Sequence, residues 1–177
     1  MTAAPSGPPR GVDRQRWVVE TLSVRPGDRL LEIGCGGGTA TALVAERLAT
    51  GHVLAIDRAA TAVRQARERN ATRIHAGTVE VRHLDIAVAE LPDGSFDTVF
   101  AVNVSLFWLA TPPGLLDRIG RLLAPGGTLH VFAERPVRAA VEAIAAQVSG
   151  ALQASGFDPV TTVVTGGRAA VAAARGR

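Results

Sequence analysis

The chain of 177 residues contains no lysine, no tyrosine and only one cysteine. Without lysine and tyrosine it cannot supply the Tyr–Lys pair of a short-chain dehydrogenase, the Gly-Lys-Ser/Thr of a phosphate-binding loop or the Schiff-base lysine of a pyridoxal enzyme. These three enzyme classes are excluded. The single cysteine, Cys35, cannot form an internal disulfide, as expected of a protein from a reducing compartment.

Long apolar runs are also missing. No run approaches the ~20 residues that a membrane-spanning helix requires, and the opening residues MTAAPSGPPRG lack the basic end and apolar core of a signal peptide. We therefore expect a cytoplasmic protein that makes no contact with membranes. The proline- and glycine-rich residues 1–11 predict a disordered tail, and residues 12–177 have the length of a single domain.

All 19 basic residues are arginine, which inflates the isoelectric point to 10.8 although the net charge is only +3. With no lysine or tyrosine to titrate, little lowers the charge before arginine itself does. The arginines are scattered through expected helices, close to Glu, Asp or Gln. This pattern is typical of solvated helix faces and does not favour a nucleic-acid partner.

Strands alternate with helices along the chain. Short apolar or mixed runs bounded by Gly, Pro, Asp or Asn predict strands at residues 30–33, 53–56, 79–84, 98–102 and 128–133. Apolar residues at helical spacing predict helices at 13–23, 40–48, 115–122 and 141–152, and residues 157–174 read as an antiparallel hairpin. Because right-handed crossovers return each strand in the same direction, the predicted fold is α/β: an open, doubly wound, mostly parallel Rossmann-like sheet.

The first predicted strand runs into the glycine loop of EIGCGGGT. In an open parallel sheet, ligands bind beyond the carboxyl ends of the strands, where the winding reverses. A dinucleotide site would need glycine at position 39, where this chain has Thr39. Glu32, two residues before Gly34, is a poor neighbour for pyrophosphate and suits a cationic ligand better.

At these residues the sequence resembles the class I S-adenosylmethionine-dependent methyltransferases, whose first motif is Glu/Asp-x-Gly-x-Gly-x-Gly. Here it consists of Glu32, Gly34, Gly36 and Gly38, and three further segments follow in the family's order: VLAIDR, RHLDIAVAELPDGSFDTV and LLDRIGRLLAPGGTLHVF. The resemblance is close over residues 24–133 and looser over the final helix and hairpin. It implies a seven-stranded sheet of order 3-2-1-4-5-7-6 and a methyltransferase domain of the small-molecule type.

The resemblance implies S-adenosyl-L-methionine as cofactor. Glu32 would lie near its methionine end, Asp57 would accept both ribose hydroxyls, Asp85 would accept the adenine amine, and Ile86 would pack by the ring. As alternatives, Asp57 and Asp85 could each cap a helix. The full set of expected cofactor-binding residues is Glu32, Gly34, Cys35, Gly36, Gly38, Asp57, Arg58, Asp85, Ile86 and Asn103.

The methyl acceptor should face the segment AVNVSLFWLATPP, which follows the fourth predicted strand. Asn103 is the candidate for the junction of cofactor and acceptor. Phe107 and Trp108 either wall the pocket or pack in the core. A nucleic-acid amino-methyltransferase would carry Asn/Asp-Pro-Pro-Tyr/Phe here, which this segment lacks. No carboxylate cluster indicates a metal, and we expect none of the four histidines at the carboxyl end of a strand, so no general base is identified.

The leading prediction is methyl transfer to a small-molecule acceptor whose identity and reactive atom the sequence does not give. Two alternatives stay open: a cofactor-binding, non-catalytic subunit, because no lid or base is evident, and an RNA or ribosomal methyltransferase, because of the arginines. Glu134 leads directly into the last helix, which predicts a shallow cleft roofed by the helix that bears Trp17. Either a large substrate or a second subunit, such as a homodimer partner, would then complete the site.

Overall fold

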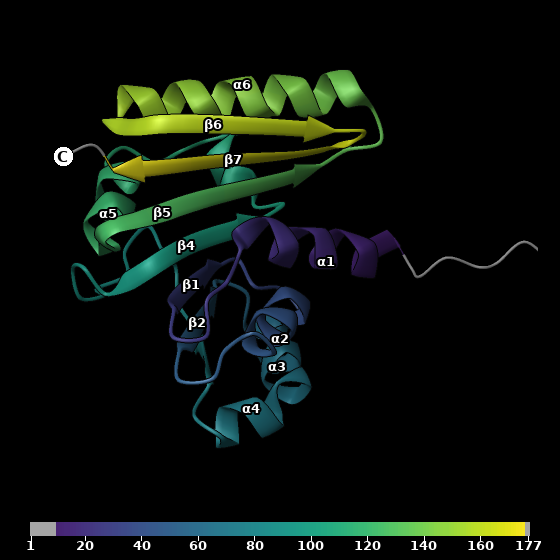
Figure 1. The fold of residues 1–177 in the computed structure, drawn as a ribbon, viewed down its shortest axis with the longest axis vertical. Helices are drawn as coiled ribbons and strands as arrows, with labels where there is room; N and C mark the ends of the chain where they lie inside the picture. The colour runs from purple at the N-terminus through teal and green to yellow at the C-terminus, as the bar shows by residue number, and fades with distance from the viewer. Residues whose placement is uncertain (1–9, 176–177) are drawn as a thin grey trace, which may run out of the picture.

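The computed structural model describes residues 10–175. Their elements, shown in Figure 1, are α1 (Arg10–Leu22), β1 (Arg29–Ile33), α2 (Thr39–Ala45), β2 (His52–Asp57), α3 (Ala60–Arg69), α4 (Ala71–His75), β3 (Val79–His83), β4 (Phe96–Val102), the 3-10 turn η1 (Ser105–Phe107), α5 (Leu115–Leu122), β5 (Leu123–Glu134), α6 (Arg138–Ala154), β6 (Phe157–Thr165) and β7 (Arg168–Arg175).

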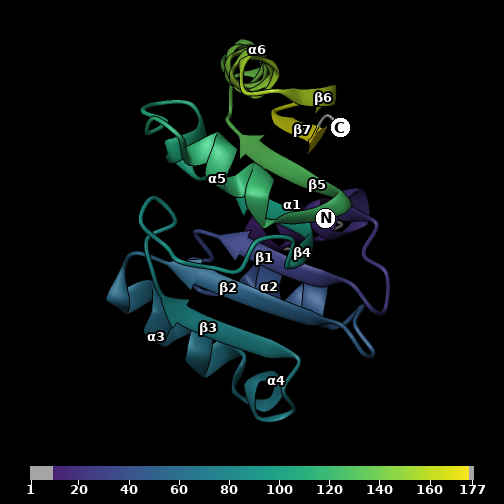
Figure 2. The ribbon, with the colours of Figure 1, turned by 90° about the vertical axis from the view of Figure 1, so that its left-hand side faces the viewer.

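The strands form one sheet of order β3-β2-β1-β4-β5-β7-β6, as predicted. The first five strands in this order are parallel, and β7 runs antiparallel to both β5 and β6. Figure 2 shows the twist of the sheet from β3 to β6. The chain leaves β1 toward β2 on one side and later returns to β4 on the other, so the winding reverses between β1 and β4.

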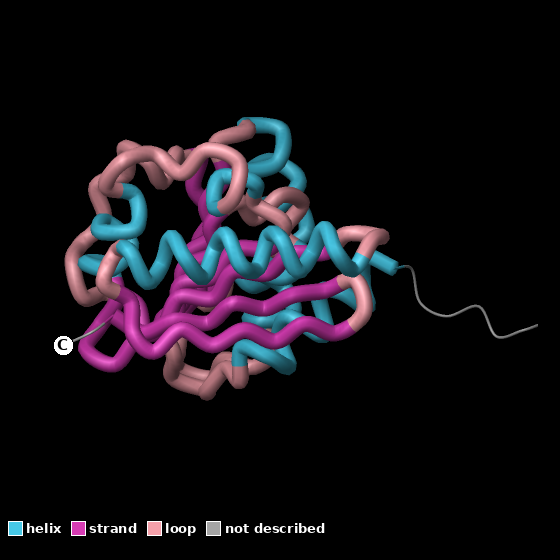
Figure 3. Tube along the Cα trace, turned by 90° about the horizontal axis from the view of Figure 1, so that it is seen from above, coloured by secondary structure: helices cyan, strands magenta, loops and turns pink. Residues whose placement is uncertain are grey.

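The sheet separates two hydrophobic cores, because successive strand residues point to opposite faces. Leu30 and Phe132 pack with α1, α2 and α3 on one face, and Leu31 and Val131 pack with α5 and α6 on the other. Figure 3 shows the long helix α6 lying over the strands of its face, where it contacts β5, β6 and β7. The doubly wound α/β prediction is confirmed.

Several local predictions differ from the structure. Helix α1 begins at Arg10, inside the segment expected to be a tail, while residues 1–9 of that segment lie outside the described residues. Strand β4 begins two residues earlier than predicted, so Asp97 is its second residue, and it accepts hydrogen bonds from the backbone and guanidinium of Arg29 at 2.9 and 3.1 Å. Residues 125–127 lie within β5 at an irregularity in its register with β4: β5 pairs with β4 at Leu123 and again from Thr128 onward, and Gly126 between them has a φ of 78°.

Within residues 10–175, no helix combines the length and the apolar character that a membrane span would need.

The α5 side of the core provides a test of the packing. Ile119 is fully buried, so Ile119→Ala should lower the free energy of unfolding by about 2–5 kcal/mol through lost burial and a cavity. Val163→Ala on edge strand β6, where the side chain is 55% exposed, is the control and should change it by no more than about 0.5 kcal/mol. Urea unfolding of both variants measures the difference, and equal effects would contradict this packing.

Candidate functional site

A cavity of about 570 Å³ opens at the carboxyl ends of the strands on both sides of the winding reversal. This volume is within the usual range for a small-molecule site, roughly 300–1,000 Å³. It is lined by Ile33, Gly34, Ile56, Asp57, Arg58, Leu84, Asp85, Ile86, Ala87, Val102, Asn103, Val104, Ser105, Leu106, Leu109, Ala110 and Pro112. Six of the ten expected cofactor residues are in this lining: Gly34, Asp57, Arg58, Asp85, Ile86 and Asn103.

Asp57 ends β2 and holds the glycine loop. Its Oδ2 accepts the backbone N–H of Gly36 at 2.9 Å, and its Oδ1 accepts that of Ala59 at 2.9 Å, just before α3. An ionised carboxylate has about four acceptor positions. Each oxygen therefore keeps capacity for one further donor from the cavity, which fits a pair of adjacent hydroxyls. Structural and ligand-binding roles are compatible in this residue.

Asp85 lies beyond the end of β3 and behaves similarly. Its Oδ1 accepts the backbone N–H of Ala87 at 2.9 Å, which closes a local turn and not a helix cap. Ile86, buried to 3% exposure, follows it in the cavity wall. A carboxylate and an apolar side chain thus border the same part of the cavity. An amino-substituted aromatic base requires this combination, an acceptor for its amine and an apolar surface for its ring.

The end of β2 and the end of α3 hold the glycine loop in place. Gly34 and Cys35 donate their backbone N–H groups to the carbonyl of Ile56 at 2.8 and 3.0 Å. Gly36 has a φ of 52°, and a side chain there would meet open space. Gly38 differs, because a Cβ there would lie 2.6 Å from Nδ2 of Asn70. Gly36 leaves room for a ligand, whereas Gly38 is needed for contact with α3.

Two residues that hold this loop were missed from sequence. Arg69 Nε donates to the carbonyl of Gly37 at 2.7 Å, and the fully buried Asn70 donates to that of Gly38 at 3.1 Å. Both lie at the end of α3 in the segment ARERN, which carries no motif. Only the three-dimensional contact between α3 and the loop reveals their role.

Glu32 does not line the cavity. Its side chain is 2% exposed and accepts a short hydrogen bond from the hydroxyl of Thr41 in α2. Burial raises the pKa of Glu32 to about 8, although the hydrogen bonds from Thr41 oppose this shift. Strand alternation turns Glu32 toward α2 and away from the cavity lining, and its expected place near the methionine end of the cofactor stays a prediction.

Cys35 also points away from the cavity, into the core shared by α1 and α2. Burial, together with the nearby Glu32 and Asp57, raises the pKa of its thiol to about 12. The thiol is thus protonated at neutral pH. Cys35 takes part in the loop through its backbone N–H and through a hydrogen bond from its thiol to the carbonyl of Gly36 at 3.8 Å.

Asn103 lies at the exit of β4 with a φ of 57°, a left-handed conformation that asparagine tolerates. Its Oδ1 accepts the backbone N–H of Glu134 at 2.8 Å and Nη1 of Arg135 at 3.3 Å. Asn103 therefore lines the cavity as expected and also joins the carboxyl ends of β4 and β5.

Of the two alternatives for Phe107 and Trp108, the structure supports packing in the core. Phe107 and Trp108 are 2% and 5% exposed and pack in the core, while Leu106 and Leu109 line the cavity. Residues 104–112 form one side of the cavity, and the expected roof, Trp17, borders a different hollow. Sequence alone could not distinguish which of four consecutive apolar residues face inward.

His83 corrects the expectation about histidines, because it is the last residue of β3. Its Nε2 lies 3.0 Å from the carbonyl oxygen of Arg58, and it is not among the residues that line the cavity. No group of three or more His, Cys, Asp or Glu side chains within residues 10–175 is arranged to hold a metal ion.

Comparisons with known proteins agree with this geometry. A family model described as a methyltransferase domain matches residues 31–129. An uncharacterized methyltransferase of Mycobacterium tuberculosis is 37% identical over 102 residues, which cover 58% of this chain and 48% of the relative. A trans-aconitate 2-methyltransferase of Acidovorax ebreus is 35% identical over 122 residues, covering 67% of this chain and 44% of the relative. The chain therefore spans less than half the length of either curated relative.

The fold is also similar to solved structures. The crystal structure of a SAM-dependent methyltransferase from Aquifex aeolicus superposes with a TM-score of 0.74 at 22% sequence identity, covering 90% of this chain and 88% of that one.

Substitution by alanine should have different effects at Gly36 and Gly38, because the surroundings of the two glycines differ. Both Gly36 and Gly38 have positive φ, so alanine is strained at either position. Only Gly38→Ala also drives a Cβ to 2.9 Å from the backbone of Ala66. We expect Gly38→Ala to lower the free energy of unfolding by about 1–3 kcal/mol more than Gly36→Ala does. Thermal or urea unfolding of the pair tests this, and equal losses would contradict the contact between loop and α3.

Glu32 should make stability depend on pH. Its pKa rises from 4.5 to about 8 on folding, so the folded state favours the proton. This contribution to stability is complete below about pH 4.5 and is lost as pH rises through 8. Between pH 5 and 9 the free energy of unfolding of the wild type should therefore fall relative to Glu32→Gln. A constant difference in urea titrations across this range would refute a buried, protonated Glu32.

Proposed function

The chain belongs to the methyltransferase-domain family of the class I, S-adenosylmethionine-dependent type, and on that premise we propose that it transfers a methyl group from S-adenosylmethionine to a small-molecule acceptor. One observation carries the proposal. Asp57 and Asp85, at the ends of the neighbouring strands β2 and β3, border one cavity together with Gly34 of the glycine loop.

The hydrogen-bond acceptors of the cavity suit this cofactor. The free acceptor positions of Asp57 match the two hydroxyls of a ribose, and Asp85 with Ile86 matches an adenine amine and ring. The open space at Gly36 lets a ligand approach the loop backbone. Glu32 would act indirectly, by holding α2 through Thr41 and adding negative charge beneath the loop once it is ionised.

Methyl transfer from this cofactor needs few catalytic side chains. S-adenosylmethionine supplies an activated methyl group that transfers by in-line displacement. Holding an acceptor at a near-attack distance of roughly 3–3.5 Å provides much of the rate enhancement. A general base is needed only when the acceptor must first lose a proton. Asn103 and the wall formed by residues 104–112 are positioned to orient an acceptor against the cofactor.

A small organic acceptor fits this wall better than a nucleic acid does. Val104, Leu106, Leu109 and Pro112 make it apolar, with Ser105 as a polar group. The related Acidovorax ebreus protein is named for a small acid, trans-aconitate. We also propose that the protein is cytoplasmic and that a homodimer partner is one way to complete the site.

Two rival functions give distinct results. A ribosomal or RNA methyltransferase would bind RNA with an affinity that falls steeply as salt increases. A non-catalytic subunit would bind the cofactor and give no methylated product with candidate acceptors, alone or with a co-purifying partner.

Calorimetry with S-adenosylhomocysteine tests the cofactor site. Asp85→Asn preserves the turn to Ala87 but replaces one acceptor oxygen by a donor, and Asp57→Ala removes both oxygens. Each should weaken binding by about 1.5–3 kcal/mol for every charge-assisted bond lost, roughly 10- to 150-fold.

Asp93→Ala, at an exposed turn before β4, is the charge-matched control and should bind as the wild type does. Absence of wild-type binding at millimolar ligand would overturn the proposed function. Unchanged affinity in Asp57→Ala would overturn the ribose assignment.

A further inference from the structure

A second hollow, of about 580 Å³, lies outside the residues assigned to the cofactor. It is lined by Trp17 of α1, by Glu134, Arg135 and Pro136 after β5, and by residues 165–168 of the β6–β7 turn. We call it the arginine groove. Figure 1 shows the end of β5, the β6–β7 turn and α1 converging on one side of the molecule. The backbone N–H of Arg135 donates to the carbonyl of Gly167 at 2.8 Å, which fixes two of these walls together.

Positive charge exceeds negative charge in the arginine groove. Arg168 in the groove and Arg14, which lies outside its lining, each donate to a different oxygen of Glu134 at 2.9 Å. Burial works to raise the pKa of Glu134, but the hydrogen bonds from Arg168 and Arg14 outweigh it and hold the pKa below its usual value. Glu134 is thus ionised and neutralises only one of the two guanidinium groups.

Arg135 adds a further uncompensated charge. Its Nη1 donates to the carbonyl of Glu134 at 2.7 Å and to Oδ1 of Asn103 at 3.3 Å, and it forms no salt bridge with the described side chains. Its Cζ lies 5.2 Å from the ring centre of Trp108. This stacking and the two hydrogen bonds hold the guanidinium in a fixed orientation without neutralising it.

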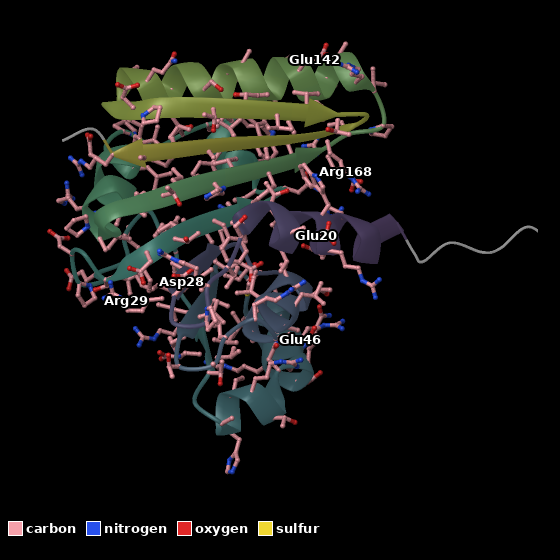
Figure 4. All side chains as sticks on the ribbon, viewed as in Figure 1. Glu20, Asp28, Arg29, Glu46, Glu142 and Arg168 are labelled. Carbon is pink, nitrogen blue, oxygen red and sulfur yellow. The ribbon has the colours of Figure 1, made fainter. Side chains whose placement is uncertain are left out.

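The groove also has donors and a flat wall. Arg168 contacts Glu134 through Nε, so its terminal nitrogens have no hydrogen-bond partner among the described residues. Its Cζ lies 5.9 Å from the ring centre of Trp17, and Figure 4 shows Arg168 beside α1. A guanidinium fork binds a carboxylate through two parallel hydrogen bonds. A planar carboxylic acid could engage Arg168 while its apolar part lies against Trp17.

One contact joins the groove to the cofactor cavity. Arg135 borders the groove, Asn103 borders the cavity, and the two side chains are hydrogen-bonded to each other. Arg135 therefore places a positive charge next to Asn103, at the boundary between the groove and the cavity. A cationic or purely apolar acceptor would gain nothing from the surplus positive charge.

We propose that the arginine groove is the acceptor-recognition site, and that it selects a planar carboxylic acid whose carboxylate binds Arg168. Arg135 adds positive charge beside Asn103, past which the atom to be methylated extends. This inference rests on the proposed methyltransferase function. It assigns Arg135 and Arg168 to acceptor binding and leaves cofactor binding to Asp57 and Asp85.

Matched probes test the selection by charge. Cinnamate and cinnamamide have nearly the same shape and differ in charge, and calorimetry would measure each against protein saturated with S-adenosylhomocysteine. We expect cinnamate to bind at least tenfold more tightly than cinnamamide. Equal affinities, or displacement of cinnamate by inorganic phosphate at lower concentration, would overturn selection of a carboxylate.

Variants locate the site. Arg135→Gln and Arg168→Gln should each weaken cinnamate binding about tenfold or more, the loss expected for a hydrogen bond to a charged group, while S-adenosylhomocysteine affinity stays unchanged. Arg135→Lys, which keeps the charge, should recover part of the loss. Arg138→Gln removes an exposed arginine of α6 that pairs with Glu142, and it should bind cinnamate as the wild type does.

The outcomes separate the two proposals. If S-adenosylhomocysteine binds but none of the arginine variants changes cinnamate affinity, the groove assignment fails and the proposed function stands. If cinnamate binds through the arginines but S-adenosylhomocysteine does not bind to the unliganded protein, the groove is a carboxylate site without a role in methyl transfer, and the acceptor assignment fails with the proposed function.

Discussion

The hydrogen bond from the backbone of Gly36 to the carboxylate of Asp57 is the interaction on which the site depends. It fastens the loop after β1 to the end of β2, next to the point where the winding of the sheet reverses. The same carboxylate borders the cavity and starts the connection to α3. A single side chain thereby sets both the shape of the loop and the polarity of the pocket.

Around this bond, titratable side chains lie at different depths, and the deepest, Glu32, has a pKa raised to about 8 and is protonated at neutral pH. Glu32 is buried beneath the loop with Thr41, Asp57 and Asp85 border the cavity, and the arginines lie past Asn103. Two carboxylates, Asp57 and Asp85, therefore border the cavity proposed for the cofactor, and Arg135 and Arg168 border the neighbouring groove. This polarity suits a positively charged methyl donor and a negatively charged acceptor, which attract the protein at different places and also attract each other.

The sequence predicted the parts of the molecule that depend on periodicity and order. Alternating strands and helices indicated the doubly wound sheet, and the four ordered motifs indicated its strand order and six residues that line the cavity. It did not predict side-chain direction at Glu32, which depends on strand alternation and on a partner nine residues away. Nor did it separate Phe107 and Trp108 from Leu109, because all are apolar and only packing decides which is buried. Arg135 and Arg168 carried no motif, since elements 33 residues apart in sequence bring them together.

A structure of the protein with bound S-adenosylhomocysteine tests the central claim most directly. The account predicts that both ribose hydroxyls donate to Asp57, that the adenine amine donates to Asp85, and that Glu32 still binds Thr41 without touching the ligand. The sulfur should point toward Asn103 and the arginine groove. Ribose bound away from Asp57, or a sulfur directed away from Asn103, would contradict it.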